Sequence, residues 1–177
     1  MLIPFAFSNK LQKLVDVDEV ESGLACNCVC PSCNMLLQAR KGDKNEHHFS
    51  HHEAALDVCA YSYWVSIRDM AKQIILEAKF ISINLTKTLN LHTIPRKLGS
   101  SLVEIFGTEK KNNGFDLEIT TSIGILNVYF LTPEEHRQKY RLADDYFTHA
   151  LVLEIDLQRI QNDNRCSKKE QLKKLIL

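Results

Sequence analysis

Hydrophobic residues recur at helical spacing in the middle of the chain. Trp64, Ile67, Ala71 and Ile74 fall on one face of a segment that contains neither glycine nor proline. Apolar residues three and four positions apart form the buried stripe of an amphipathic helix. The pattern therefore predicts a helix over residues 62–79.

Alternating and β-branched residues predict strands on both sides of this helix. Two short strands are expected over residues 5–8 and 14–20. A hairpin is expected over residues 115–120 and 125–131, because a Ser-Ile-Gly turn separates two strand-like runs. The strongly apolar run at 150–157 predicts a strand that is buried and central in its sheet.

Four further segments complete the predicted order. We expect strands near residues 81–85 and 102–106, a helix that starts after Thr132 and runs to residue 146, and a last short helix that Ser167 begins with a capping box. From residue 61 onward the order is a helix, one or more strands, the hairpin, a helix and a strand, which in its simplest form is αβββαβ. A strand that follows a helix needs a sheet to pack on, so this part should be an α/β domain with a mixed sheet.

Composition narrows the classes of function. Twenty-two basic residues balance 22 acidic ones, so the net charge is zero and the chain has no global electrostatic attraction to DNA or to anionic membranes. No apolar run approaches the length of a membrane span, and the first residues lack the basic start of a signal peptide. We therefore expect a cytoplasmic protein without a membrane partner, in which thiols stay reduced.

Cysteine and histidine gather in a segment with little apolar periodicity, residues 23–59. Cys30-Pro-Ser-Cys33 has the spacing of a zinc knuckle, and His48-Phe-Ser-His51 offers two imidazoles that can reach the same ion from a turn or a helix start. This spacing predicts one structural Zn²⁺ ion bound by Cys30, Cys33, His48 and His51. Four ligands close the coordination shell, so the expected role is in folding and not in catalysis.

Three other cysteines leave the ligand set open. Cys26, Cys28 and Cys59 are near in sequence, so one of them can replace a predicted ligand, or the three can bind a second ion. A segment without a hydrophobic core of its own needs a cross-link, such as a bound metal ion, to fold stably. We expect a zinc-binding module with a short β-hairpin over residues 1–60, and a second domain over residues 61–177.

The cysteine and histidine motifs resemble those of a known family. Cys30-Pro-Ser-Cys33, the basic turn before Gly42 and His48-Phe-Ser-His51 are similar to the N-terminal zinc element of proteins related to the competence protein CoiA. In that family a restriction-endonuclease-like domain of the PD-(D/E)xK type follows. The resemblance implies such a domain over residues 61–177, and a role in bacterial DNA processing or defence.

The resemblance extends into the second part of the chain. Ala71-Lys-Gln-Ile-Ile-Leu-Glu77 is similar to the helix of that domain, Gly114-Phe-Asp116 to its strand aspartate, and the segment 153–157 to its closing strand. A nuclease of this class needs the aspartate on one strand, and an acid and a lysine on the next, to hold Mg²⁺ and activate water. Asp116 matches the first requirement, and Glu118 and Glu109 can extend an acidic cluster around it.

The strand that faces Asp116 does not supply the rest of a nuclease site. With a turn of even length the facing side chains are Asn127 and Tyr129, and with an odd turn they are Leu126, Val128 and Phe130. Neither set contains an acid or a lysine. The sequence therefore favours a catalytically degenerate nuclease domain, with an active Mg²⁺-dependent nuclease at a migrated site around Asp116 as an alternative.

The leading hypothesis is thus a zinc-binding, nuclease-related protein that serves as a nucleic-acid-binding or assembly subunit, with DNA expected over RNA. Because the net charge is zero, contact with nucleic acid requires local basic clusters. The candidates lie in the zinc loop and in the helix after the hairpin: Arg40, Lys41, Lys44, Arg137, Lys139 and Arg141. A protein–protein adaptor without a nucleic-acid role is the remaining alternative.

Overall fold

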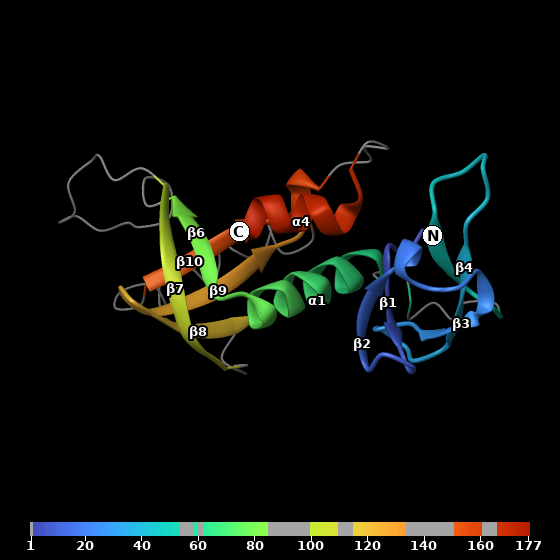
Figure 1. Ribbon diagram of the computed structural model, residues 1–177, viewed down its shortest axis with the longest axis horizontal. Coiled ribbons are helices and arrows are strands. Elements are labelled where there is room, and N and C mark those ends of the chain that lie inside the picture. Colours follow the sequence, from blue (N-terminus) through green and yellow to red (C-terminus); the bar gives the residue numbers. More distant parts are fainter. Residues whose placement is uncertain are drawn as a thin grey trace. The chain divides into compact units, whose positions relative to one another are not determined.

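The computed structural model spans residues 1–177, and it describes residues 2–53, 59, 62–84, 100–109, 115–133, 151–160 and 166–177 (Figure 1). The chain forms two compact units. The first comprises Met1–Gln73 and Asn162–Gln171, and the second comprises Ile74–Gln161 and Leu172–Leu177. Each unit contains one five-stranded sheet, and helices accompany them, so the protein has the mixed α/β character that the sequence predicts.

The sheet of the first unit is antiparallel and has the strand order β2-β1-β3-β4-β5. Its strands are β1 (Phe5–Ser8), β2 (Lys13–Asp16), β3 (Gly23–Val29), β4 (Leu36–Arg40) and β5 (His48–His51). The predicted hairpin of β1 and β2 is confirmed, whereas β3, β4 and β5 are strands that the sequence pattern did not predict.

The second predicted strand ends earlier than expected, at Asp16. A 3-10 helix, η1 (Val17–Glu19), replaces its last residues. The Asp16 carboxylate accepts a hydrogen bond from the Asp18 amide, and the Glu19 carboxylate accepts one from the Asp16 amide at 2.9 Å. This reciprocal capping box satisfies amides that a strand would otherwise pair, and so it stops β2.

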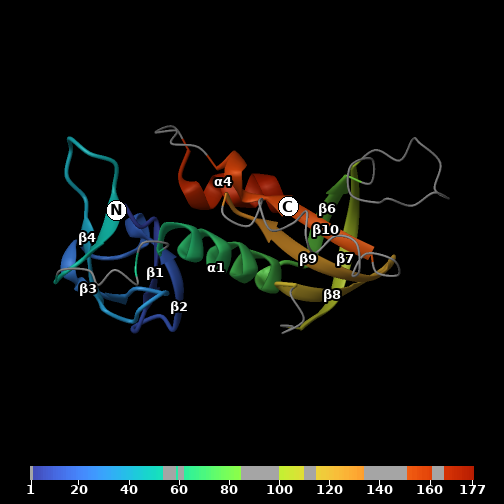
Figure 2. The same cartoon turned by 180° about the vertical axis from the view of Figure 1, so that it is seen from behind.

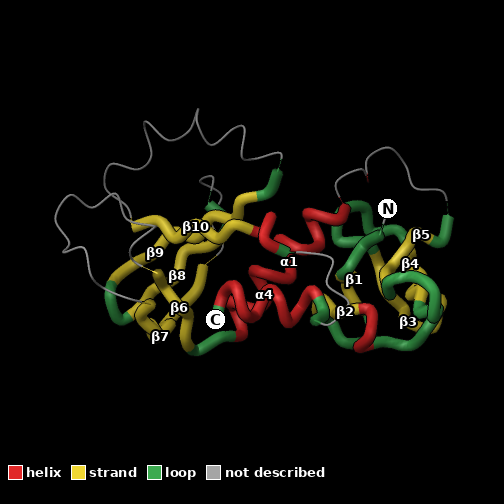
Figure 3. Tube along the Cα trace, turned by 90° about the horizontal axis from the view of Figure 1, so that it is seen from above, coloured by secondary structure: helices red, strands yellow, loops and turns green. Residues whose placement is uncertain are grey.

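The sheet of the first unit closes on itself through a single bridge. Ile3, just before β1, pairs with Phe49 of β5 by two backbone hydrogen bonds of 3.1 and 2.7 Å. Figure 3 shows β1, β4 and β5 together in this unit. This bridge pairs part of the β5 edge, and the core of the unit contains a cluster of eleven buried residues: Ile3, Ala6, Val15, Val17, Cys26, Cys28, Cys30, Leu37, Ala39, Phe49 and Cys59.

A segment from near the other end of the chain completes the first unit. The Lys168 ammonium, whose side chain is almost fully buried, pairs with Glu46, which lies 122 positions earlier. Lys169 pairs with Glu19 at 2.6 Å across 150 positions. Both lysines open helix α4 (Lys168–Ile176), where the Ser167 hydroxyl accepts a hydrogen bond from the Glu170 amide, as the predicted N-cap requires.

The predicted central helix is confirmed as α1 (Ser62–Glu77). Ile67, Met70, Ala71 and Ile75 are fully buried, which follows the helical spacing of the apolar residues. Within the first unit, the Gln73 side-chain amide binds both backbone groups of Leu14, accepting from its N–H at 2.8 Å and donating to its carbonyl at 3.2 Å. The side chain thus pairs with β2 much as a neighbouring strand would.

The sheet of the second unit is mixed and has the order β10-β9-β8-β7-β6 (Figure 2). Its strands are β6 (Phe80–Asn84), β7 (Ser100–Glu109), β8 (Leu117–Thr121), β9 (Gly124–Leu131) and β10 (Leu151–Asp156). Strand β10 is parallel to β9, and the other neighbours are antiparallel. Both β6 and β7 precede the hairpin, as the strands expected near residues 81–85 and 102–106 do, so the sheet has one strand more than the simplest form of the predicted order.

The predicted hairpin is confirmed, and its turn has an even length. Thr121 pairs with Gly124, so two residues form the loop, and the Thr121 hydroxyl donates to the Gly124 carbonyl at 2.7 Å. Glu118 consequently pairs with Asn127, and Asp116 lies one position before the pair of Leu117 and Val128. One face of the hairpin is buried through Leu117, Ile119, Leu126, Val128 and Phe130.

Strand β10 is correctly predicted as a strand but not as a central one. Among the described strands it lies at the edge of the sheet, although Leu153 and Ile155 are buried. A short 3-10 helix, η4 (Leu157–Arg159), follows it. The helix predicted from residue 132 to 146 lies outside the described residues from 134 onward. Within the described residues, no helix combines the length and apolar character needed to cross a membrane.

Candidate metal centre

Two ligands of the candidate metal centre come from a knuckle between β3 and β4. The Asn34 amide donates to the Cys30 carbonyl at 2.9 Å, and the Cys30 amide donates to the Met35 carbonyl at 2.9 Å. Asn34 has a φ of 59°, a left-handed conformation that asparagine tolerates better than most residues. These bonds close a tight turn that directs the thiols of Cys30 and Cys33 to the same point.

A third ligand comes from the last residue of β5. His51 pairs with Leu37 of β4, and the next amide, that of His52, donates to the Leu36 carbonyl at 3.0 Å. Because β4 leads directly out of the knuckle, this register carries the His51 imidazole to the two cysteines. The His51 Nε2 atom lies 3.4 Å from the Cys33 Sγ atom.

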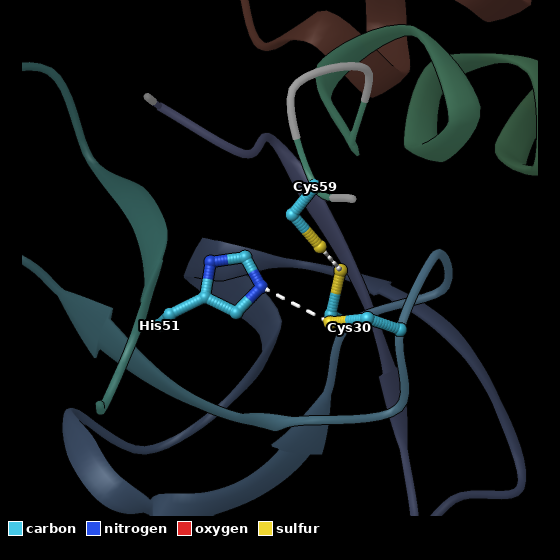
Figure 4. A group of neighbouring side chains, drawn as sticks. Cys30, His51 and Cys59 are labelled. Atoms are coloured by element: carbon cyan, nitrogen blue, oxygen red, sulfur yellow. Dashed lines mark hydrogen bonds between the residues drawn. The ribbon is translucent and has the colours of Figure 1, made fainter. Parts of the chain in front are cut away.

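Cys59 supplies the fourth ligand, from the chain just before α1. Its side chain is only 5% exposed, and its Sγ atom lies 3.8 Å from that of Cys30. Figure 4 shows the sulfur atoms of Cys30 and Cys59 directed at each other, with the His51 ring beside them. The ligand atoms of Cys30, Cys33, His51 and Cys59 all lie within 4.8 Å of one another.

These separations fit a tetrahedral zinc ion. With zinc–sulfur bonds of about 2.3 Å and zinc–nitrogen bonds of about 2.0–2.1 Å, a tetrahedron places two sulfurs about 3.8 Å apart and a sulfur and a nitrogen about 3.6 Å apart. The observed 3.8 Å between Cys30 and Cys59 and 3.4 Å between Cys33 and His51 agree with this geometry. The four side chains can therefore hold a metal with little rearrangement.

Burial and the hydrogen bonds among the neighbouring sulfurs shift the pKa values of the ligands. Burial raises the pKa of the Cys59 thiol to about 12, and the neighbouring Cys33 and Cys30 sulfurs add to the rise. Burial also raises the pKa of Cys30. At Cys33 burial acts in the same direction, but hydrogen bonds to Cys59 and to the Met35 backbone outweigh it, so its pKa is lowered. Burial lowers the pKa of His51, which favours the neutral imidazole that a metal requires.

His48, expected as the fourth ligand, lies outside this group. The prediction assumed that His48 and His51 sit on a turn or a helix start, where residues three apart share a face. They lie instead on strand β5, where residues three apart point to opposite faces. The His48 Nδ1 atom is 2.8 Å from the Glu46 carbonyl oxygen. Cys59 occupies the position in the cluster that was expected for His48.

Cys26 and Cys28 belong to the core of the first unit. The Cys26 thiol donates to the Leu37 carbonyl at 3.4 Å, and the Cys28 thiol donates to the Cys26 carbonyl at 3.2 Å. Burial raises the pKa of Cys28 to about 12, so it remains a neutral thiol. Among the described residues, no second group of three or more cysteines, histidines and acids brings its ligand atoms as close together as the four above.

The acidic residues considered for catalysis share one face of the second sheet. Glu109 of β7 pairs with Glu118 of β8, and Glu118 pairs with Asn127 of β9. Asp116 is buried, and its carboxylate accepts a hydrogen bond from the Phe130 amide at 3.0 Å. Within the described part of the chain, these acids do not gather three ligand oxygens at the spacing of the cysteine and histidine cluster.

The basic residues of the zinc loop have different surroundings. The exposed Arg40 donates from Nε to the Ser50 hydroxyl at 2.7 Å, and Lys41 donates to the Val20 carbonyl. Lys44 is exposed. The second predicted basic cluster, Arg137, Lys139 and Arg141, lies outside the described residues.

Comparisons with known proteins add no family. No family model matches the chain, and no curated protein or solved structure matches it either. The similarity to CoiA-related proteins therefore rests on the residues of this sequence alone.

Cys59 is the member of the cluster that sequence spacing did not select. Twenty-five residues separate it from Cys33, and it has no partner at knuckle spacing.

Proposed function

We propose that this chain is a zinc-stabilised, nuclease-related protein that does not cleave nucleic acid by itself. It serves as a nucleic-acid-binding or assembly subunit in bacterial DNA processing or defence, in the cytoplasm. The observation that carries the proposal is the Cys30, Cys33, His51 and Cys59 cluster, whose separations match a tetrahedral zinc ion.

The zinc ion would have a structural role. Three cysteines and one histidine fill the four positions of a tetrahedral shell, which leaves no position for a substrate or a reactive water. The ligands come from three separate places: the knuckle, the end of β5 and the segment before α1. A single ion would therefore cross-link the closed sheet to the chain that enters the helix.

The nuclease relationship is supported by the order of elements in the second unit. A helix precedes an antiparallel meander, β7-β8-β9, and a last strand runs parallel to β9. Parallel neighbours require a crossover connection, for which residues 132–150 provide the length. Within the described residues this order agrees with the one that the resemblance to a PD-(D/E)xK domain implies, apart from the additional strand β6, and the second helix of that order is expected in residues that lie outside the described part of the chain.

The absence of cleavage activity is supported by the hairpin register. Continuing the register by one residue places Asp116 beside Tyr129, and the next side chain along that face of β9 is Asn127. A nuclease of this class needs an acid and a lysine in these positions. The Asp116 carboxylate instead accepts a hydrogen bond from the Phe130 amide. This bond gives Asp116 a structural role at the start of the hairpin.

Contact with nucleic acid is supported by the loop between β4 and β5. Arg40 and Lys41 line a surface hollow of about 860 Å³, together with Gln38, Asn45, Glu46 and His48. The hydrogen bond of Arg40 to Ser50 uses Nε alone, so the other guanidinium nitrogens remain available to bind phosphate oxygens. The exposed Lys44 follows in the same loop.

A protein–protein adaptor is the second candidate, favoured by strand β7. Leu102 and Phe106 lie on one face of this strand and are 66% and 64% exposed. Phe80 of β6, which pairs with Glu104 between them, is 43% exposed. Apolar side chains gathered on one exposed face are typical of an interaction surface.

The experiment compares zinc content, DNA binding and cleavage in one protein preparation. Duplex DNA should bind with an affinity that falls steeply as salt rises, and Arg40→Ala with Lys44→Ala should weaken binding about tenfold and lower the salt slope by about two. The matched control is Lys10→Ala with Lys13→Ala, two exposed lysines of the same unit that should bind as the unaltered protein does.

Each part of the proposal has its own contradicting result. Well-folded protein with less than about half an equivalent of zinc would contradict the structural zinc ion. Binding that does not change between low and moderate salt would favour the adaptor. Cleavage with Mg²⁺ or Mn²⁺ that Asp116→Ala abolishes would show an active nuclease and overturn the degenerate assignment.

A further inference from the structure

The candidate metal centre holds three sulfur atoms close enough to react with one another. The Sγ atoms of Cys30 and Cys59 are 3.8 Å apart, and the Sγ atom of Cys33 lies within 4.8 Å of both. A disulfide needs two sulfurs at about 2.05 Å, a displacement that side-chain rotation and a small shift of the chain can supply. When zinc is bound, all three sulfurs are thiolates, the form that reacts with oxidants.

The three sulfurs differ in their access to solvent. Cys30 is fully buried and Cys59 is 5% exposed, whereas Cys33 is only partly buried. Cys33 lies two residues after Pro31 in the knuckle, and it is the only one of the three cysteines of the centre that is not buried. The centre thus combines one accessible thiolate with two sheltered ones.

We propose that this centre is also a reaction site for hydroperoxides, with Cys33 as the attacking thiolate. Reaction forms a disulfide from Cys33 to Cys30 or Cys59 and releases the zinc ion. The inference rests on the zinc binding proposed above. It assigns the centre a second property, reversible loss of its metal in response to an oxidant.

The reaction takes two steps. The Cys33 thiolate attacks one oxygen of the hydroperoxide; the oxygen–oxygen bond breaks, a sulfenic acid forms, and hydroxide or an alkoxide leaves. The thiolate of Cys30 or Cys59 then attacks the Cys33 sulfur, the sulfur–oxygen bond breaks, and hydroxide leaves as the disulfide forms. Two thiolates lose two electrons in total, and the hydroperoxide takes them up.

The disulfide removes the metal because it removes two of its four ligands. Only His51 and one cysteine remain, too few for a structural zinc site. The first unit then loses the cross-link between its sheet and the chain that enters α1. A dithiol reductant and zinc should restore the centre, since the disulfide step is reversible.

The other cysteines provide comparisons within the same molecule. Cys26 and Cys28 are buried in the core, and both donate their thiols to backbone carbonyls, so they should stay unmodified. Cys166 is partly exposed and lies outside the cluster, with its thiol 3.4 Å from a Glu170 oxygen. If exposure alone decided which thiol reacts with peroxide, Cys166 would be oxidised. The proposed reaction instead oxidises Cys33.

The test uses the zinc-loaded protein, with zinc content measured before any oxidant is added. Hydrogen peroxide is added in the presence of a metallochromic chelator and a reagent that traps sulfenic acids, and peptides are then mapped by mass spectrometry. Zinc release should be at least about tenfold faster with peroxide than without it, one zinc should leave for every two thiols lost, and the trap should label Cys33. The matched Cys166→Ser variant should give the same rate.

The outcomes separate this inference from the proposed function. A protein that carries no zinc at the start contradicts the proposed function itself. A zinc-loaded protein that keeps its metal while Cys166 alone is oxidised overturns only the peroxide reaction. A disulfide that excludes Cys33, or trapping at Cys26 or Cys28, overturns the assignment of Cys33 as the attacking thiolate.

Discussion

The two units of this protein fill their interiors in different ways. The cluster of buried residues inside the sheet of the first unit contains four cysteines and two alanines among its eleven members, and the fully buried Phe5, Ile67 and Met70 of the same unit lie outside this cluster. The second unit buries large aliphatic residues on neighbouring strands of its sheet, such as Ile119 of β8, Val128 of β9 and Ile155 of β10. Small side chains bury less apolar surface, so the first core contributes less hydrophobic free energy for each residue.

This difference explains why the metal ligands lie where they do. A closed sheet with short strands and small buried side chains gains stability from a cross-link, and Cys30 and Cys59 are members of both the core and the metal cluster. The second unit needs no such link, because ordinary packing of its hairpin supplies a core. The comparison predicts that one unit depends on zinc and the other does not.

The largest effect should come from the ligand that sequence spacing did not select. Cys59→Ser should abolish stoichiometric zinc binding and unfold the first unit, because metal binding contributes on the order of 10 kcal/mol to such folds. His48→Ala should retain one zinc ion and the fold. Elemental analysis and hydrogen exchange of both variants measure this, with Cys166→Ser as control. Zinc lost from His48→Ala and kept by Cys59→Ser would contradict the proposed ligand set.

The second unit should respond to packing and not to metal. Phe130 is fully buried, and Phe130→Ala should destabilise this unit by about 3–5 kcal/mol, because it leaves a cavity in a packed sheet. Phe106→Ala removes the same ring from a 64% exposed position and should cost less than about 0.5 kcal/mol. Denaturant unfolding measures both, and equal losses would contradict the assigned core. Zinc content should remain at one equivalent in each variant.

Lowering the pH should weaken zinc binding, and so it should destabilise the first unit and not the second. The pKa of Cys59 is raised to about 12 and that of Cys30 is raised, so both are neutral thiols in the metal-free protein at pH 7, and zinc must displace their protons. The lowered pKa of His51 means that it contributes no proton near pH 7. Zinc affinity should therefore rise with pH, and weaken by at least about a hundredfold for each unit that the pH falls, because zinc displaces at least the protons of Cys30 and Cys59.

Competition with a chelator of known zinc affinity, between pH 6 and pH 8, measures this dependence. An affinity that does not change over this range would show that the metal is held by groups other than thiols. The stability of the second unit should change little over the same range, which provides the internal control for the comparison.

The sequence predicted elements best where apolar periodicity was uninterrupted. Helix α1 and the β8–β9 hairpin follow directly from spacing, because their buried faces are made of large apolar residues. Strands β3, β4 and β5 were not predicted, because cysteines and small residues occupy their buried positions: Cys26, Cys28 and Ala39 alternate inward as larger residues would. The edge position of β10 depends on long-range pairing, which local pattern does not specify.

The candidate metal centre was predicted in part, because three of its four residues, Cys30, Cys33 and His51, were expected to lie together. The knuckle of Cys30 and Cys33 is set by local spacing, and the structure brings His51 to it. The choice between His48 and Cys59 depended on whether residues 48–51 form a turn or a strand, and strand geometry turns His48 away. The position of Cys59 follows from tertiary structure alone.

The late segment that completes the first unit has a consequence for how the protein folds during its synthesis. Glu19 and Glu46 leave the ribosome long before Lys168 and Lys169, so the pairs that join them form only after residues 74–161 of the second unit have been translated. Closing so long a loop has an entropic cost that local contacts do not. The four metal ligands, in contrast, are all translated within the first 59 residues. A zinc ion bound at that stage would hold the early sheet together while translation of the rest continues, and protect a nascent chain whose own docking segment does not yet exist.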